Sequence, residues 1–157
     1  MNPRDLLLTA AQIQDMQGEL KTHFQNPNAV RINKSLGDAV GLKNIGVHLI
    51  QVAPGKDSTE YHIHHHEEEC VYVLQGKATA IIDQEEFRLN PGDFLGFPAS
   101  TAAHNIINDG EDDLICLVMG QRLPFDVGDY PNKKQRIYRF NGEWNVVDWH
   151  QIIKPKS

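Results

Sequence analysis

The chain has 157 residues, of which 40% are hydrophobic and 23% charged, and its formal net charge is −6. This length supports one hydrophobic core and the composition is typical of a globular protein, so we expect a single domain over residues 1–157. The negative charge argues against a nucleic-acid partner, because phosphate binding requires clustered lysine and arginine side chains. The only such cluster is Lys133, Lys134 and Arg136.

Near the N-terminus, the apolar run at residues 6–8 is far shorter than the core of a signal peptide or a membrane span of about 20 residues. We therefore expect a cytoplasmic protein with no membrane partner. Two cysteines, Cys70 and Cys116, lie within apolar runs. That placement is typical of reduced, buried thiols and not of a disulfide scaffold.

The first predicted element is a short helix at residues 9–16, capped by Thr9 and interrupted by Gly18. From about residue 45 onward the pattern changes to short apolar segments separated by turn residues, such as those at 90–93. The strands predicted there cover residues 47–52, 71–74, 78–82, 87–89, 94–97 and 114–119. Strands at this spacing predict an all-β sandwich or small barrel.

The predicted strand at residues 114–119 has no polar face, so both sides of its sheet should be covered. On the strand at 71–74, alternation places Cys70, Tyr72 and Leu74 on the outer side if their neighbours face inward. We expect the cover to come from the chain's own extensions, residues 1–43 and 121–157, together with a second copy in a homodimer.

The segment YHIHHHEEEC, residues 61–70, contains half of the chain's eight histidines. His62 and His64 are separated by one residue, so on a strand they point to the same side, with Cα atoms about 6.6 Å apart. A bend after His64 would return Glu69 to the same place, and His104 is available from a later segment. Three imidazoles and a carboxylate suit a divalent first-row metal.

Two spaced motifs surround these residues. The first reads Gly55-KDSTEY-His62-Ile63-His64-HHEE-Glu69-CVYVLQ-Gly76, and the second reads Gly92-DFLGF-Pro98-ASTAA-His104-NII-Asn108. Both resemble the metal-binding motifs of the cupin superfamily. Relative to the family pattern, one residue is added after Gly55 and one before His104, and a serine or threonine replaces a glycine of the second motif.

The resemblance covers residues 44–120 and implies a double-stranded β-helix (jelly-roll) barrel with both chain extensions packed on the outside. It also implies one divalent transition metal, such as Zn, Fe, Mn or Ni, at a mouth of the barrel. The implied ligands are His62, His64, Glu69 and His104. Residues 35–50 and 129–131 are similar to a group of small bacterial cupins called sugar-phosphate-isomerase-like.

The number of residues between motif positions indicates which histidines and which glutamate of residues 61–70 match the metal ligands of the cupin motif. An earlier glutamate in place of Glu69 would break the interval to Gly76 that the cupin motif requires. His64 and His66 as the metal pair would leave too few residues before Glu69. The register therefore favours His62 and His64 as the pair.

The remaining polar side chains of this region have less specific predictions. We expect His65 and His66 to lie at the surface of the bend, and Glu67 and Glu68 to supply surface charge or hydrogen bonds to the ligating imidazoles. His48 is interpreted as a core histidine, with a position near the metal as the alternative.

A metal with a free position can polarise a bound oxygen, activate water or bind dioxygen. We therefore expect a small metalloenzyme acting on a small molecule, either an isomerase or epimerase of a sugar phosphate or a dioxygenase of an oxidisable substrate. Spacing alone identifies no general acid or base, and His48, Tyr61 and Glu60 are the candidates. The alternatives are a non-catalytic barrel that binds a small ligand through the metal, and a structural jelly roll without metal.

Overall fold

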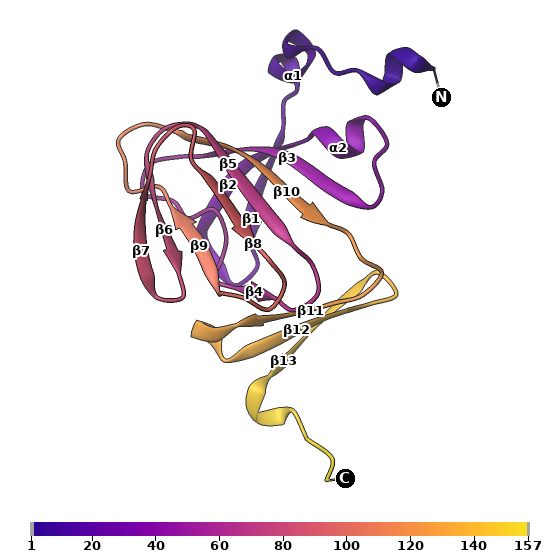
Figure 1. The fold of residues 1–157 in the computed structure, drawn as a ribbon, viewed down its shortest axis with the longest axis vertical. Coiled ribbons are helices and arrows are strands. Elements are labelled where there is room, and N and C mark those ends of the chain that lie inside the picture. The colour runs from indigo at the N-terminus through magenta and orange to yellow at the C-terminus, as the bar shows by residue number, and fades with distance from the viewer. Residues whose placement is uncertain (1, 157) are drawn as a thin grey trace.

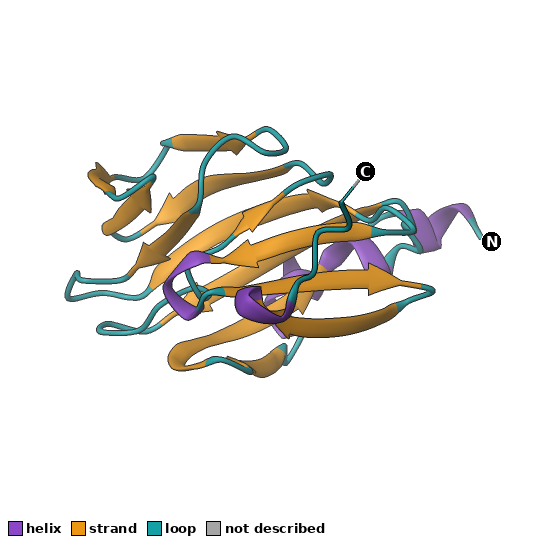
Figure 2. Cartoon of the chain, turned by 90° about the horizontal axis from the view of Figure 1, so that it is seen from below, coloured by secondary structure: helices purple, strands orange, loops and turns teal. Residues whose placement is uncertain are grey.

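The computed structural model describes residues 2–156, and strands dominate it while helical segments are few and short (Figure 1, Figure 2). The helices are α1 (Ala10–Asp15) and α2 (Leu36–Ala39), and 3-10 turns lie at Pro3–Leu6, Pro131–Lys133 and Trp149–Gln151. The strands are β1 (Glu19–His23), β2 (Asn26–Ser35), β3 (Ile45–Val52), β4 (Ile63–His64), β5 (Glu69–Gln75), β6 (Ala78–Ile82), β7 (Glu85–Leu89), β8 (Phe94–Phe97), β9 (His104–Ile107), β10 (Leu114–Gln121), β11 (Asp126–Tyr130), β12 (Gln135–Phe140) and β13 (Glu143–Asp148). Every strand predicted from the sequence is present, with ends that differ by at most two residues.

The strands form antiparallel sheets in the orders β1-β2-β3-β10-β5-β8, β13-β12-β11-β4 and β7-β6-β9. In Figure 1 the six-stranded sheet crosses the body, the β7-β6-β9 sheet lies to its left, and β11 to β13 lie below, beside β4. The predicted all-β fold is therefore confirmed.

The core lies between the six-stranded and the three-stranded sheets. On β5, Val71 and Val73 are 3% and 0% exposed, whereas Tyr72 and Leu74 are 40% and 47% exposed, as strand alternation predicts. The buried cluster draws one or two inward residues from each contributing strand: Ile50, Val52, Val71, Val73, Ala78, Ala80, Leu89, Leu95, Phe97, Ile106, Leu114 and Cys116. The outward residues of β10 are only half-buried, so their expected cover is partial within this one chain.

The two chain extensions add strands that the sequence did not predict. β1 and β2 form a hairpin that adds two strands at one edge of the six-stranded sheet. β11 to β13 lie across the lower end of the body (Figure 1). Apolar residues in these segments are interrupted by polar residues and prolines, which hides the strand period. The N-terminal helix is present as predicted, and the Thr9 Oγ1 atom accepts a hydrogen bond from the Gln12 backbone N–H at 3.2 Å.

Both cysteines are free thiols. Cys116 is fully buried in the core, as expected, but Cys70 is partly exposed because it faces the outer side of β5. No helix within residues 2–156 is both long and apolar enough to cross a membrane. The cytoplasmic location stays a prediction.

Candidate metal centre

The four predicted ligands come together at the end of the barrel that carries β4. Backbone hydrogen bonds join His62 and His104 in both directions, with N···O distances of 3.1 and 2.8 Å. His64 lies on β4 opposite Gly128 of β11, and Glu69 begins β5 opposite Phe97 of β8. Strand pairing thus brings side chains from distant parts of the sequence to one place.

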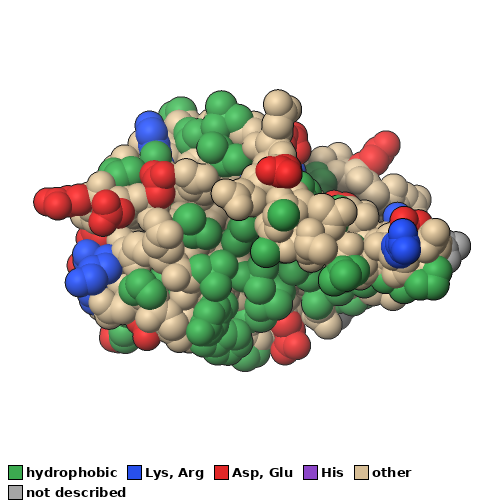
Figure 3. All heavy atoms as spheres, turned by 90° about the horizontal axis from the view of Figure 1, so that it is seen from above, with side chains coloured by type: hydrophobic (Ala, Val, Ile, Leu, Met, Phe, Trp, Pro, Cys, Tyr) green, Lys and Arg blue, Asp and Glu red, His purple; other side chains and the backbone are tan. Residues whose placement is uncertain are grey.

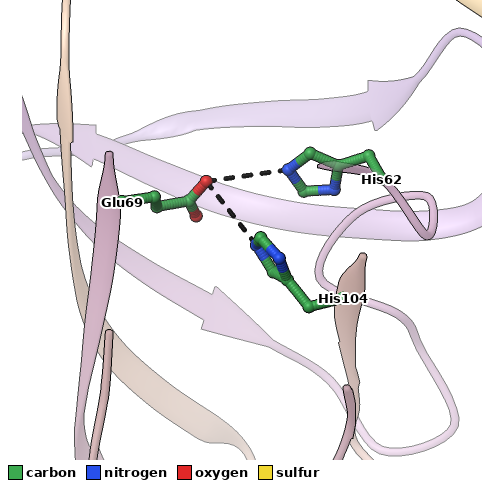
Figure 4. A group of neighbouring side chains, drawn as sticks. All are labelled: His62, Glu69 and His104. Carbon is green, nitrogen blue, oxygen red and sulfur yellow. Dashed lines mark ion pairs between the residues drawn. The ribbon is translucent and has the colours of Figure 1, made fainter. Parts of the chain in front are cut away.

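The Glu69 carboxylate lies at the centre of the three imidazoles. Its Oε2 atom is 3.6 Å from Nε2 of His62, 3.7 Å from Nε2 of His64 and 3.9 Å from Nε2 of His104. Figure 4 shows two of these contacts, with the His62 and His104 rings directed at the carboxylate. Donor atoms that bind one ion at about 2.1 Å lie roughly 3–4 Å apart. Ligand atoms of His62, Glu69 and His104 all lie within 4.8 Å of one another and could hold one ion, whereas His64 meets this criterion with Glu67 and Asp126 instead.

The other ring nitrogen of each histidine already has an acceptor. These Nδ1 contacts are to Glu60 O at 2.8 Å for His62, to Asp126 Oδ2 at 2.6 Å for His64 and to Ala102 O at 3.2 Å for His104. Each Nδ1 therefore carries the proton, and each Nε2 presents a lone pair. The His104 Nε2 atom is buried and has no hydrogen-bond partner. Three lone pairs and a carboxylate repel one another unless a cation lies between them, so these residues fit a metal ion.

The candidate ligands differ in the direction of their pKa shifts. Burial by itself raises the pKa of Glu69, but the imidazoles of His104 and His62 bring that pKa well below its usual range. Burial lowers the pKa of His62, against the opposing effect of Glu69. Burial also acts to lower the pKa of His64, but the hydrogen bond to Asp126 and the charge of Glu69 outweigh it and raise the pKa.

The altered loop before His104 is accommodated by one strained residue. Ser100 has a φ of 58°, and its backbone N–H donates to His64 O at 2.8 Å. The Ser100 hydroxyl donates to His65 O at 3.1 Å. The Phe97 ring stacks on the His104 ring with centroids 3.5 Å apart and an interplanar angle of 2°. The added residue is thus absorbed in the turn, and His104 keeps its place beside Glu69.

His65 has a structural partner instead of a free surface position. Its Nε2 atom lies 2.8 Å from Oδ2 of Asp129, which also accepts from Arg136 Nη2 at 2.9 Å. The Oδ1 atom of Asp129 accepts from Arg136 Nε at 2.7 Å and from Trp149 Nε1 at 3.2 Å. His65 therefore joins the bend to the C-terminal strands. His66 is exposed, as predicted, with its ring 5.1 Å from that of Phe125.

The predicted surface role of Glu67 is wrong. Glu67 is 7% exposed, pairs with the Arg139 guanidinium and accepts the Leu123 backbone N–H at 2.7 Å. Glu68 is exposed, as expected. Alternation within the bend turns Glu67 toward the C-terminal segment, so its carboxylate ties that segment to the barrel without a hydrogen bond to a candidate ligand.

A cavity of about 890 Å³ lies beside the four side chains, within the range of about 300–1,000 Å³ typical of small-ligand sites. Its walls come from the inner faces of β1, β2 and β3 and from the C-terminal strands. His48 lines it, half-buried, with Nδ1 3.2 Å from Asn33 Nδ2. Glu60 and Tyr61 are buried outside its lining.

Among the cavity residues that sequence patterns missed are Arg31, His23 and Tyr130. They come from strands that the sequence did not predict, and Arg31 and His23 are isolated polar residues without a motif, while Tyr130 lies in the family-like segment 129–131. The signal available was the alternation of Ala29, Arg31 and Asn33, which places a cation on the same side as two residues that the fold buries.

Comparison with known proteins agrees with these observations. A family model described as a cupin domain matches residues 48–120. A crystal structure from Acidithiobacillus ferrooxidans, provisionally described as a sugar phosphate isomerase, is 60% identical and covers 98% of this chain and 99% of its own, with a TM-score of 0.96. A structure from Silicibacter pomeroyi, described as a sugar phosphate isomerase from a cupin superfamily, is 28% identical over 85% of this chain and 87% of its own, with a TM-score of 0.77.

A more distant similarity involves an oxygenase. Over 48 residues the chain is 44% identical to quercetin 2,3-dioxygenase of Bacillus subtilis. The match spans 31% of this chain but only 14% of that enzyme. It therefore concerns one segment of the barrel and not the whole of the larger protein.

Proposed function

This chain belongs to the cupin superfamily, whose fold is a jelly-roll barrel, and we propose that it is a metal-dependent isomerase of a small phosphorylated sugar. The observation that carries the proposal is the convergence of three imidazole Nε2 atoms and the Glu69 carboxylate on one cavity. The description of the 60% identical relative supports the substrate class, because the two chains match over nearly their whole length.

In this proposal His62, His64 and His104 bind one divalent ion through Nε2, and Glu69 binds it through a carboxylate oxygen. Imidazole and carboxylate donors suit zinc, iron, manganese or nickel. When bound, such an ion supplies Lewis-acid polarisation of a substrate oxygen.

Isomerisation also requires hydrogen-bond donors to the oxygens on which charge develops. Tyr130 Oη lies 3.4 Å from His23 Nε2, and the Gln25 backbone N–H donates to His23 Nδ1 at 3.2 Å. Nε2 of His23 therefore carries the ring proton and donates to Tyr130, which leaves the Tyr130 hydroxyl hydrogen free to point into the cavity. Burial raises the pKa of Tyr130 to about 12, so the hydroxyl keeps its proton near neutral pH. We assign Tyr130 the role of a donor to a substrate oxygen.

The test is direct conversion of a panel of aldose and ketose phosphates by purified protein loaded separately with each of the four metals, followed by NMR. Conversion by the wild type that is lost in His64→Ala and kept in His150→Ala, a change at an exposed histidine, supports the proposal. Absence of conversion with every metal contradicts it.

Two other outcomes would identify the alternative functions. Consumption of dioxygen with an oxidisable substrate would indicate a dioxygenase, which the short match to quercetin 2,3-dioxygenase favours. Ligands that raise the melting temperature and are recovered unchanged would indicate a non-catalytic binding protein.

We further infer that two copies of the chain associate through the outer side of the six-stranded sheet. Tyr72 and Phe94 are directly opposite each other on β5 and β8 and are 40% and 64% exposed. The N-terminal segment projects from the body with Leu6 and Leu7 60% and 64% exposed (Figure 1). Seen from above, the molecule presents hydrophobic side chains over its middle, with charged side chains around them (Figure 3). Clusters of exposed apolar side chains favour a protein partner.

Light scattering after size-exclusion chromatography tests this assembly. We expect a dimer for the wild type and a shift toward monomer in Tyr72→Ser/Phe94→Ser, because the change removes apolar contact area. A wild-type monomer at micromolar concentration would contradict the inference.

A further inference from the structure

Two cations lie side by side on the inner wall of the cavity. Lys21 of β1 is directly opposite Arg31 of β2, and both line the cavity that holds the candidate metal ligands. Like charges in directly opposed positions on neighbouring strands destabilise a sheet. A cation pair on an inner wall therefore indicates a ligand of opposite charge.

Arg31 lacks a counter-ion of its own. Its Nη1 atom donates to Ser58 O at 2.6 Å, and its Nε atom is buried without a partner. Among the residues that the structure describes, no carboxylate lies within ion-pair distance of this guanidinium. Burial lowers the pKa of Arg31, which reflects the cost of a charge removed from water. A bound anion would supply the missing partner.

The acidic groups near the pair do not compensate it. Lys21 contacts Glu19 at 3.3 Å, but the two side chains are 41% and 73% exposed, so this ion pair is weak. Asp129 also lines the cavity, yet Arg136 and His65 occupy its oxygens. Glu69 raises the pKa of Arg31 only from beyond ion-pair distance, and its carboxylate is directed at the imidazoles.

We propose that Arg31 and Lys21 form an anion-binding subsite that holds the phosphoryl group of the substrate while the metal centre holds its reacting oxygens. This rests on the proposed function and specifies its substrate class. A guanidinium binds phosphate through two parallel N–H···O bonds, and a lysine adds a mobile point charge. The subsite is separate from the metal ligands, because it lies on the β1–β2 hairpin outside both histidine-containing motifs.

A third cavity residue extends the specificity to the body of the substrate. Asn105 follows the candidate ligand His104, and its Oδ1 atom is buried without a hydrogen-bond partner. An unpaired amide oxygen at this place accepts a hydrogen bond from a hydroxyl group. The substrate class is thus a small polyhydroxylated phosphate monoester, with its phosphate at Arg31 and Lys21 and one hydroxyl at Asn105.

Calorimetric titration of inorganic phosphate into the metal-loaded protein tests the subsite. We expect the Arg31→Gln variant to bind phosphate at least about tenfold more weakly than the wild type, since it loses charge-assisted hydrogen bonds. Lys21→Gln should weaken binding by a smaller factor, and Arg31→Lys should recover part of the loss. Arg88→Gln, at an exposed arginine paired with Asp109, is the matched control and should bind phosphate as the wild type does.

The metal content and melting temperature of each variant are measured alongside. If Arg31→Gln does not fold, the phosphate affinity of Lys21→Gln tests the subsite, because the Lys21 side chain is 41% exposed and tolerates substitution. Phosphate affinity in Arg31→Gln and Lys21→Gln equal to that of Arg88→Gln would overturn the subsite. Acetate in place of phosphate should bind much more weakly, which separates a phosphoryl site from a general carboxylate site.

The outcome is distinguishable from that of the proposed isomerase activity. If the variants lose phosphate binding while the wild type converts no sugar phosphate with any metal, the anion-binding subsite is supported and the isomerase proposal is contradicted. If the wild type converts a sugar phosphate and Arg31→Gln does so with unchanged KM, the isomerase proposal is supported and the anion-binding subsite is contradicted.

Discussion

The Nδ1 atom of His64 lies 2.6 Å from Oδ2 of Asp126, a residue 62 positions away in the sequence and only 1% exposed. The second Asp126 oxygen accepts the backbone N–H groups of His66 and Glu67 at 3.2 and 3.3 Å. One carboxylate thus sets the ring orientation of a candidate ligand and the shape of the bend that follows it. The first C-terminal strand, outside the histidine motifs, is therefore part of the candidate metal centre.

Replacement of that carboxylate should weaken metal binding without removing a ligand. In Asp126→Asn, we expect zinc affinity to fall about 10–100-fold, because His64 loses the charged acceptor that fixes its tautomer. Competition with a chromophoric chelator measures the affinity. Asp109→Asn, at an exposed aspartate in the loop after β9 that contacts Thr79 and Arg88, is the control. Equal affinity in the two variants would show that Asp126 does not support the centre.

Metal content should separate the ligands from the neighbouring histidines. His64→Ala and His104→Ala should reduce bound metal from about one ion per chain to a small fraction, because each removes a donor from a four-residue set. His66→Ala should retain it, since His66 is exposed and points to Phe125. Elemental analysis of untagged protein gives the stoichiometry. Full metal content in His104→Ala would remove that residue from the ligand set.

The Glu67–Arg139 pair should contribute strongly to stability. Their side chains are 8% and 15% exposed, so Glu67→Gln leaves a buried guanidinium uncompensated. We expect a loss of about 3–5 kcal/mol in the free energy of unfolding, measured by chemical denaturation. Asp38→Asn breaks the exposed Asp38–Arg122 pair and should cost less than about 1 kcal/mol. Similar losses of unfolding free energy in both variants would show that the buried pair contributes no more to stability than the exposed one.

Acid should weaken the contacts of Asp129 with the bend and the C-terminal strands. Burial opposes ionisation of Asp129, but hydrogen bonds from Arg136 and His65 hold its pKa below the usual value of 3.8. Because the folded-state pKa is depressed, the stabilisation is present above about pH 4 and is lost as the pH falls through the folded-state pKa. The free energy of unfolding should therefore fall more steeply below pH 4 in the wild type than in Asp129→Asn. Parallel pH profiles would contradict this linkage.

The central strands and the His62–His64 pair could be predicted from local pattern, whereas the resemblance to the cupin motifs supplied Glu69 and His104. A strand repeats every two residues, so His62 and His64 share a side, and the apolar runs at 78–82 and 94–97 have the observed strand ends. Turn residues such as those at 90–93 mark where one strand stops and the next begins. Strand periodicity and turn positions depend on residues a few positions apart, so they can be predicted from the sequence.

The partners of those residues depend on which strands pair and in which register. The contacts of His64 with Asp126 and of His65 with Asp129 require β11 beside β4, and the Lys21–Arg31 pair requires the register of the β1–β2 hairpin. A shift of one residue would turn Arg31 out of the cavity and its neighbours into it. Spacing together with the family resemblance therefore predicts a set of candidate ligands. Only the packing of the sheets determines what orients them and which cations share their cavity, because those contacts join segments that no local period relates.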